Sequence, residues 1–193
     1  MVVQRGDRRA DIVAAAHRCI AQFGYERATT ARICAAAQVS SGTFFHYFPT
    51  KVAVLVAVLQ SGVDRTREVF ERIRATAADD ALAALEQWRE HVLAEAADED
   101  LAGFAEALSA VPDAAEVVAV LEDEKTVVRR ALVDVVTAGQ RQGTVRADIA
   151  AERAALWLSI VAEAVLGHAV EEGGLPQVFA SELEDVVTRV LRP

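Results

Sequence analysis

The sequence predicts an all-α protein, and three observations support this prediction. Apolar residues recur at three- and four-residue steps through nearly all of the 193 residues, which is the spacing of one helix face. Only ten glycines and four prolines are present, in a chain rich in alanine, valine, leucine, glutamate and arginine. Neither the alternating pattern of a strand nor a repeat of fixed period is present. About nine helices are expected.

The first helix is predicted over about residues 7–23. Ile12, Ala16 and Phe23 mark its apolar face, because they recur at helical spacing. Gly24 is expected to end it, since glycine adopts the left-handed backbone that stops many helices without a steric penalty.

Two short helices are predicted next. Thr29 is placed to cap the second helix, which carries Ile33 on its apolar side. Ser40 is placed to cap a third helix over about 41–47, and Pro49 stops it because proline disfavours helical geometry in the residue before it. Six further helices follow, over about 51–74, 80–97, 100–110, 112–141, 150–171 and 177–191.

Charge divides the chain unevenly. The whole chain has a net charge of -9, yet residues 1–51 hold seven Arg or Lys against three acidic residues. The remainder holds 13 basic and 26 acidic residues. A basic first quarter on an acidic body is typical of a protein whose N-terminal part meets phosphate.

The composition also indicates where in the cell the protein is located and what role its cysteines have. The N-terminus is polar after three residues, and no uninterrupted apolar run reaches the roughly 18 residues of a membrane helix. Cys19 and Cys34 are too few for a disulfide framework or a zinc site, and we expect both to be small core side chains. A cytoplasmic protein without membrane association is expected.

The second and third helices, joined by a turn at residues 38–41, have the layout of a helix-turn-helix. Such units place the last helix in the major groove of DNA. A seven-residue helix is unstable alone in water, so it must be packed against its neighbours. Phe44 and Phe48, four residues apart, are expected to provide this packing. Four residues are expected on the opposite face, with Tyr47 beside them: Ser41, Gly42, Phe45 and His46.

A longer pattern surrounds this unit. Residues 12–25 read I-x-x-A-A-x-x-x-x-A-x-x-G-Y, residues 29–33 read T-x-x-x-I, and residues 39–51 read V-S-x-G-T-F-F-x-Y-F-x-x-K. In this order the stretch from Arg8 to Leu59 resembles the DNA-binding domain of the TetR family of transcriptional repressors. The resemblance implies a helix-turn-helix DNA-binding domain over 1–51 and a helical ligand-binding and dimerisation domain over 52–193. It also implies a homodimer that binds a palindromic operator and is released by a small-molecule effector.

The resemblance assigns DNA contacts to particular residues. A helix N-terminus, as at Thr29, suits a phosphate because free N–H groups and the helix dipole favour an anion there. Arg5, Arg8 and Arg9 are candidates for a basic arm. The predicted DNA-contacting residues are Thr29, Ser40, Ser41, Gly42, Thr43, Phe45, His46, Tyr47 and Lys51.

Three residues depart from the family pattern. Gln38 stands in the turn where the family usually has glycine, and a left-handed backbone there costs glutamine about 1 kcal/mol. Ser41 replaces the usual basic residue, and Phe45 replaces a tyrosine whose hydroxyl often touches DNA in relatives. The operator sequence therefore does not follow from the resemblance.

The resemblance also places a ligand cavity among the middle helices. Trp88 and His91, three residues apart, can stack on and hydrogen-bond a small molecule, although each such residue taken alone is more often core or surface. The last two helices are apolar on more than one face, which favours a partner subunit. The predicted cavity residues are Trp88, His91, Phe104, Trp157 and Glu163, and the predicted interface residues are Val161, Val165, Val186 and Val190.

Two other classes of protein compete with this interpretation. One is a helical small-molecule-binding or interaction protein with a degenerate DNA-binding head, for which Gln38, Ser41 and Phe45 are the signs. The charge division favours a functional head over this alternative. An enzyme is the more distant rival, because no metal-ligand spacing, glycine-rich phosphate loop or nucleophile–base arrangement is found. Neither a cofactor nor a metal is expected.

Overall fold

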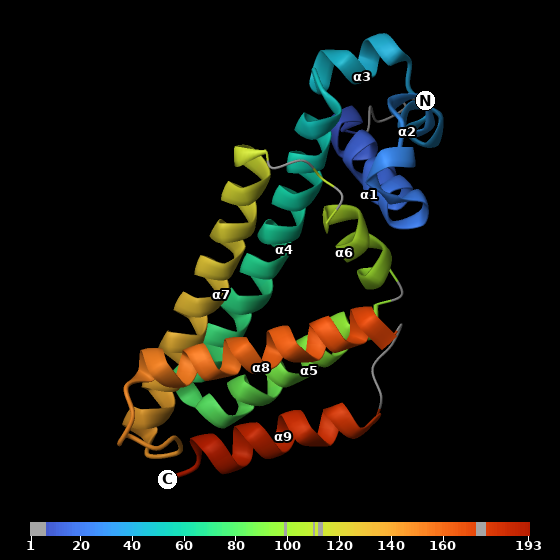
Figure 1. Cartoon of the computed structure of the whole chain (residues 1–193). Helices are drawn as coiled ribbons and strands as arrows, with labels where there is room; N and C mark the ends of the chain where they lie inside the picture. Colours follow the sequence, from blue (N-terminus) through green and yellow to red (C-terminus); the bar gives the residue numbers. More distant parts are fainter. Residues whose placement is uncertain (1–6, 99, 110, 112–113, 173–176) are drawn as a thin grey trace, which may run out of the picture. The chain divides into compact units, whose positions relative to one another are not determined.

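The computed structural model in Figure 1 describes residues 7–98, 100–109, 111, 114–172 and 177–193. Within these residues the secondary structure consists of helices and their connections, so the all-α prediction is confirmed. The helices are α1 (Arg8–Arg27), α2 (Thr30–Ala37), α3 (Ser41–Tyr47), α4 (Lys51–Asp79), α5 (Ala81–Ala96), α6 (Leu101–Ser109), α7 (Ala115–Gln142), α8 (Ala151–Glu172) and α9 (Gln177–Leu191).

The helices form two compact units. The N-terminal unit comprises residues 1–63 and 100–122, and the C-terminal unit comprises residues 64–99 and 123–193. Helices α4 and α7 therefore contribute residues to both units. This division by compactness differs from the functional boundary between residues 51 and 52, which remains a prediction.

Two predicted helix ends need correction. Helix α1 continues to Arg27, although Gly24 inside it has a φ of 75° and a ψ of 160°, so glycine interrupts the helix and one more turn follows. Helix α4 continues to Asp79 rather than to about residue 74, because no residue there favours a break. The next helix begins after Asp80, whose carboxylate accepts a hydrogen bond from the Ala83 N–H at 3.0 Å.

The N-terminal unit has one hydrophobic core. Helix α1 packs against α2 and α6, and α2 packs against α3. Helix α6 approaches α1 very closely, since a Cβ atom on Gly103 would lie 2.5 Å from the carbonyl oxygen of Ala21. The largest side chains of this core are almost fully buried, and each contributes roughly 1.5–3 kcal/mol through burial: Ile12, Ile20, Ile33, Phe44 and Leu55.

In the C-terminal unit α5 packs against α8 and α9, which also contact each other. The side-chain amide of Gln142 joins the end of α4 to the start of α5. Its oxygen accepts a hydrogen bond from the Ala81 N–H at 2.9 Å, and its nitrogen donates to the Ala77 carbonyl at 2.9 Å. Buried large side chains in this unit include Leu85, Trp88, Leu132, Leu158 and Leu183.

Helix α8 is long and apolar. Its length and a mean hydropathy of 1.4 over 18 residues meet the composition expected of a membrane span. One of its faces, which includes Leu158 and Val165, is buried within the C-terminal unit. Leu156 and Ile160 are exposed, at 43% and 52%. These features also fit a core helix with a second apolar face. Glu163 interrupts the apolar residues of α8, so the prediction that no uninterrupted apolar run reaches about 18 residues still holds.

Candidate functional site

The turn between α2 and α3 has a left-handed backbone. Gln38 has a φ of 55° and a ψ of 41°, and its N–H donates to the Ala35 carbonyl at 3.2 Å. The following N–H, of Val39, donates to the Cys34 carbonyl at 3.0 Å. These bonds close the end of α2 and redirect the chain into α3. Gln38 thus takes the geometry for which glycine is the least costly residue.

Both short helices are capped by the predicted hydroxyl groups. The Thr29 Oγ1 accepts a hydrogen bond from the Arg32 N–H at 3.3 Å. The Ser40 Oγ accepts one from the Thr43 N–H at 3.0 Å and lies 2.9 Å from the Thr43 hydroxyl. The capping roles of Thr29 and Ser40 are therefore confirmed, whereas their contact with DNA remains a prediction.

The aromatic residues of α3 divide between core and surface as predicted. Phe44 is fully buried and Phe48 is 3% exposed, with ring centroids 6.0 Å apart. Phe45 and Tyr47 are 51% and 39% exposed, and His46 is exposed with its ring 5.1 Å from that of Tyr47. The exposed face of α3 includes Ser41 and Gly42 as well. Two phenylalanines thus hold a helix that offers polar and aromatic groups to solvent.

Lys51 is held by the N-terminal unit itself. Its ammonium donates to the Glu26 carbonyl at 3.1 Å and lies 4.1 Å from the centre of the Tyr25 ring. Partial burial lowers the pKa of Lys51, and the Glu26 carboxylate partly opposes this. Tyr25 and Glu26 are positioning residues that the sequence analysis missed, although Tyr25 belongs to the quoted Gly-Tyr motif. If Lys51 contacts a phosphate as predicted, its ammonium does so while it also contacts the Glu26 carbonyl and the Tyr25 ring.

Arg9 and Arg32 of the N-terminal unit rest on aromatic rings. The Arg9 guanidinium lies 5.5 Å from the centre of the Phe48 ring, at the end of α3. The Arg32 guanidinium lies 4.7 Å from the centre of the Phe23 ring. Stacking of this kind orients a guanidinium, and the Arg32 Nη1 also donates to the Arg27 carbonyl at 3.4 Å. Arg5 of the predicted arm lies outside the described residues.

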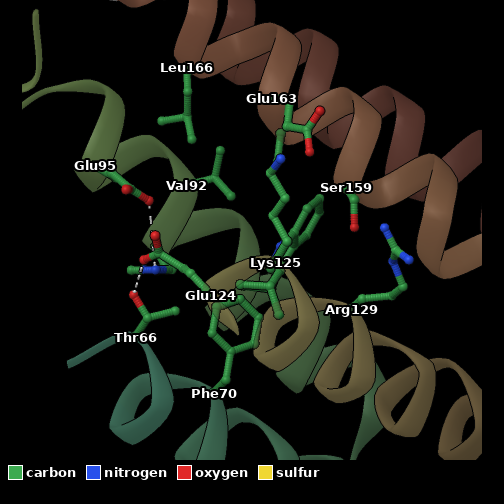
Figure 2. A pocket seen from close by; sticks show the side chains of 14 residues that line it. Thr66, Phe70, Val92, Glu95, Glu124, Lys125, Arg129, Ser159, Glu163 and Leu166 are labelled. Atoms are coloured by element: carbon green, nitrogen blue, oxygen red, sulfur yellow. Dashed lines mark hydrogen bonds and ion pairs between the residues drawn. The ribbon is translucent and has the colours of Figure 1, made fainter. Parts of the chain in front are cut away.

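The C-terminal unit contains a cavity of about 270 Å³, shown in Figure 2. Four helices line it, and its wall combines aromatic and aliphatic side chains with charged groups and two hydroxyls. The lining residues are Thr66 and Phe70 of α4; Trp88, His91, Val92 and Glu95 of α5; Glu124, Lys125, Val128 and Arg129 of α7; and Ser159, Ala162, Glu163 and Leu166 of α8.

The structure brings three of the five predicted cavity residues together. Trp88, His91 and Glu163 line the cavity. Phe104 belongs to the N-terminal unit, where its ring stacks on His17 at 5.3 Å, and it does not line this cavity. Trp157 does not line the cavity either, and the Arg153 guanidinium lies 5.4 Å from its ring. An aromatic residue in the right part of a sequence need not face the cavity, because only one side of its helix does.

The polar groups of the cavity gather around two carboxylates. The Thr66 hydroxyl donates to the Glu124 Oε1 at 2.9 Å. The His91 Nε2 lies 3.9 Å from the Glu95 Oε2, and the His91 ring meets the edge of the Phe70 ring at 5.7 Å. Helices α4, α5 and α7 therefore meet at this polar cluster.

The surroundings shift two pKa values in this cluster. Burial lowers the pKa of His91, and the positive charge of Arg72 lowers it further, so the neutral imidazole is favoured. Loss of water raises the pKa of Glu95, as do the negative charges of Glu124 and Asp98. Each of these three effects disfavours the negative charge of Glu95.

Sequence reasoning missed most of the charged cavity residues. The acidic stretch at 122–124 has the composition of a solvated helix face, and nothing in it indicates which residue faces inward. The missed polar residues are Thr66, Glu95, Glu124, Lys125, Arg129 and Ser159. Among the residues that the structure describes, no group of three or more His, Cys, Asp or Glu is arranged to hold a metal ion.

The predicted interface valines differ in accessibility. Val165 is 4% exposed in the single chain, so it offers almost no surface to a partner, and Val161 is half-buried. The exposed apolar side chains on α8 are Leu156 and Ile160 instead. The side chains of Val186 and Val190 lie outside the described part of the chain.

Sequence comparison with known proteins finds relatives for about a third of the chain. Residues 12–58 match the family described as bacterial regulatory proteins, tetR family. An HTH-type transcriptional repressor of Mycobacterium tuberculosis is 37% identical over 65 residues, which are 34% of this chain and 35% of that repressor. The chain thus aligns with about a third of the length of the curated relatives that it matches.

Solved structures extend the likeness to the whole fold. A TetR transcription regulator from Haloarcula marismortui is 21% identical and superposes with a TM-score of 0.84 over 96% of this chain and 99% of that one. A transcriptional regulator from Saccharomonospora viridis, solved in complex with choline, is 20% identical with a TM-score of 0.81. That match covers 98% of this chain and 100% of the other. At these identities the likeness shows the fold.

Proposed function

Because the chain belongs to the TetR family of transcriptional regulators, we propose that it is a homodimeric repressor that binds a palindromic operator and is released by a small molecule. The observation that carries this proposal is the exposed face of α3. A buried pair, Phe44 and Phe48, fixes a helix whose other side offers His46, Tyr47 and Ser41 to solvent. Hydroxyl and imidazole groups on such a helix donate hydrogen bonds to base edges and phosphates.

Charge supports the same assignment. The surplus of basic residues over 1–51 lies in the part of the chain that carries α3, whereas the remainder is acidic. Phosphate contacts by Lys and Arg release counterions, so binding should weaken steeply with salt. The capped N-termini of α2 and α3 add a site for an anion at Thr29 and Ser40.

The C-terminal unit supplies the proposed sensor and dimer surface. Its cavity has the mixed lining of a small-molecule site, and the related fold from Saccharomonospora viridis holds choline. The exposed Leu156 and Ile160 on α8 are suited to a second copy of the chain. A symmetric dimer would present two α3 helices to two half-sites. We further propose a cytoplasmic location, DNA as the macromolecular partner and no enzymatic activity.

Titration of DNA tests this proposal. Duplexes enriched from a random pool by the purified protein should contain an inverted repeat, and affinity for them should fall at least tenfold between about 50 and 200 mM salt. The enriched site should be bound at least about 1,000-fold more tightly than a scrambled duplex. Binding without sequence preference would instead favour a helical small-molecule-binding protein with a degenerate head.

A variant pair tests the assigned face. His46→Ala combined with Tyr47→Phe should weaken operator binding about tenfold or more while the thermal unfolding midpoint is unchanged. The matched control is Gln22→Ala, an exposed substitution on α1. Equal operator affinity of the double variant and the control would show that the contact face is wrongly assigned.

A further inference from the structure

We propose that the cavity of the C-terminal unit binds a small organic cation with an apolar body, whose ammonium group lies between the carboxylates of Glu95 and Glu124. This inference rests on the proposed function and specifies the chemical class of its effector. Three properties of the cavity restrict which ligands fit: the charged groups in its wall, the apolar surface between them, and its volume.

The two carboxylates lie at one end of the cavity (Figure 2). Glu95 comes from α5 and Glu124 from α7, and the negative charge of Glu124 disfavours that of Glu95. The hydrogen bond from Thr66 fixes one oxygen of Glu124, and the neighbouring His91 favours its neutral form. A bound ammonium would relieve the repulsion between the carboxylates, because opposite charges attract strongly where water is partly excluded.

The other end of the cavity has a different polarity. Figure 2 shows the Lys125 side chain extending toward Glu163, so that this cation faces a carboxylate of its own chain. Arg129 presents N–H donors nearby, whereas the Ser159 hydroxyl donates to the Ala155 carbonyl at 3.1 Å. The positive charge of the ligand therefore lies beside Glu95 and Glu124. The opposite end of the ligand can carry an oxygen that accepts a hydrogen bond from Arg129.

The space between these ends is apolar. Phe70 and Trp88, which are 3% and 1% exposed, form part of the wall together with Val92 and Leu166. Aromatic rings attract cations as well as apolar groups, so they suit an alkyl- or arylammonium better than a carboxylate. The volume of about 270 Å³ lies just below the range of cavities that hold drug-sized molecules, which indicates a small ligand.

The same end of the cavity offers a route for regulation. A cation at Glu124 adds a second partner to the carboxylate that accepts the hydrogen bond from Thr66, and so alters the charge that this bond meets. Thr66 lies on α4 and Glu124 on α7, the two helices that also contribute residues to the N-terminal unit. A ligand that changes this bond therefore acts on both helices at once.

Calorimetric titration of the full chain without DNA tests the ligand class. The probes are 2-phenylethylammonium and n-hexylammonium, each compared with its neutral alcohol and with a carboxylate of the same length. Each ammonium probe should bind at least tenfold more tightly than its alcohol and its carboxylate. Equal or tighter binding of the carboxylates or the alcohols would overturn the inference, as would the absence of binding by both ammonium probes.

Variants locate the ammonium group. Glu95→Gln and Glu124→Gln should each weaken binding of the better ammonium probe at least tenfold and leave affinity for its alcohol within about twofold. Glu90→Gln is the matched control, because Glu90 is exposed on α5 and does not line the cavity. Equal losses for all three variants, or none for the two cavity variants, would overturn the assigned position.

The two proposals can fail separately. Ammonium binding without operator binding would refute the repressor and keep the cavity assignment. Operator binding that is unaffected by an ammonium probe bound in the cavity would refute its role as an effector and leave the DNA-binding proposal standing.

Discussion

The two candidate sites of this protein are built in opposite ways. The proposed DNA contacts in and around α3 come from residues 40–51, and those on α3 lie opposite a buried pair of phenylalanines. The lining of the cavity comes from four helices and from residues as far apart as Thr66 and Leu166. One site is a short local segment on a rigid support, and the other exists only where distant helices meet.

This difference determines what holds each site in place. On α3 the buried residues and the exposed residues alternate along one helix, so one side of the helix supports the fold and the other is the proposed contact face. In the cavity the same side chain does both, as Trp88 is 1% exposed and still forms part of the wall. Loss of a supporting residue should therefore be separable from loss of a contact on α3, and much less so in the cavity.

The largest expected effect is that of Phe44→Ala. Removing a fully buried phenylalanine leaves a void beside Phe48 and should lower the free energy of unfolding by about 3–5 kcal/mol. The neighbouring Phe45→Ala removes a side chain that is 51% exposed and should change it by less than about 0.5 kcal/mol. Urea unfolding followed by circular dichroism measures both.

Operator titration of the same pair completes the comparison. Phe45→Ala should reduce operator affinity while its unfolding curve is that of the natural chain, because Phe45 lies on the proposed contact face. Similar destabilisation by the two substitutions would mean that support and contact are not divided between the faces of α3.

A smaller effect is expected in the turn before α3. Gln38→Gly should raise the free energy of unfolding by about 1 kcal/mol, because Gln38 has a φ of 55° that glycine adopts without strain. Ala14→Gly, at an exposed position in the middle of the regular part of α1, should lower it by a similar amount, since glycine disfavours a helix interior. Thermal and urea unfolding of the two variants supply the measurement, and equal signs would contradict the assigned strain.

The sequence predicted the α3 region well because its signals are local. The caps at Thr29 and Ser40, the end of α3 at Tyr47 and the burial of Phe44 all follow from spacings of a few residues. For Gln38 the sequence predicted only what a left-handed backbone would cost, and not that the backbone is left-handed. Its backbone depends on where α2 must end relative to α3, which no residue preference decides alone.

The cavity was predicted only in part for the opposite reason. Helical spacing suggests which residues share a helix face, but the sequence does not state which faces of α4, α5, α7 and α8 point toward a common space. Trp88 and His91 were found because they are unusual residues at i, i+3 spacing. Glu95 and Glu124 were missed because glutamates on a helix are ordinarily solvated, and only tertiary packing distinguishes these two.

The smallest expected effect belongs to Glu95→Gln and depends on pH. Burial and the charges of Glu124 and Asp98 raise the pKa of Glu95 in the folded protein above its value in the unfolded chain. Below the unfolded pKa both states hold the proton, and the substitution should change nothing. As pH rises past that value the folded state resists losing its proton, so stability falls until the folded pKa is passed.

Glutamine keeps the shape of the protonated carboxyl and does not titrate. The variant should therefore match the natural protein near pH 4 and be more stable at pH 7, by less than about 1 kcal/mol because 46% of the side chain is accessible to water. His91 favours its neutral form, so its charge does not compensate Glu95 at pH 7. Unfolding midpoints at both pH values measure the effect. A variant that is less stable at pH 7 would show that the Glu95 carboxylate is stabilised in the cavity without a ligand, which would remove the repulsion on which cation binding is argued.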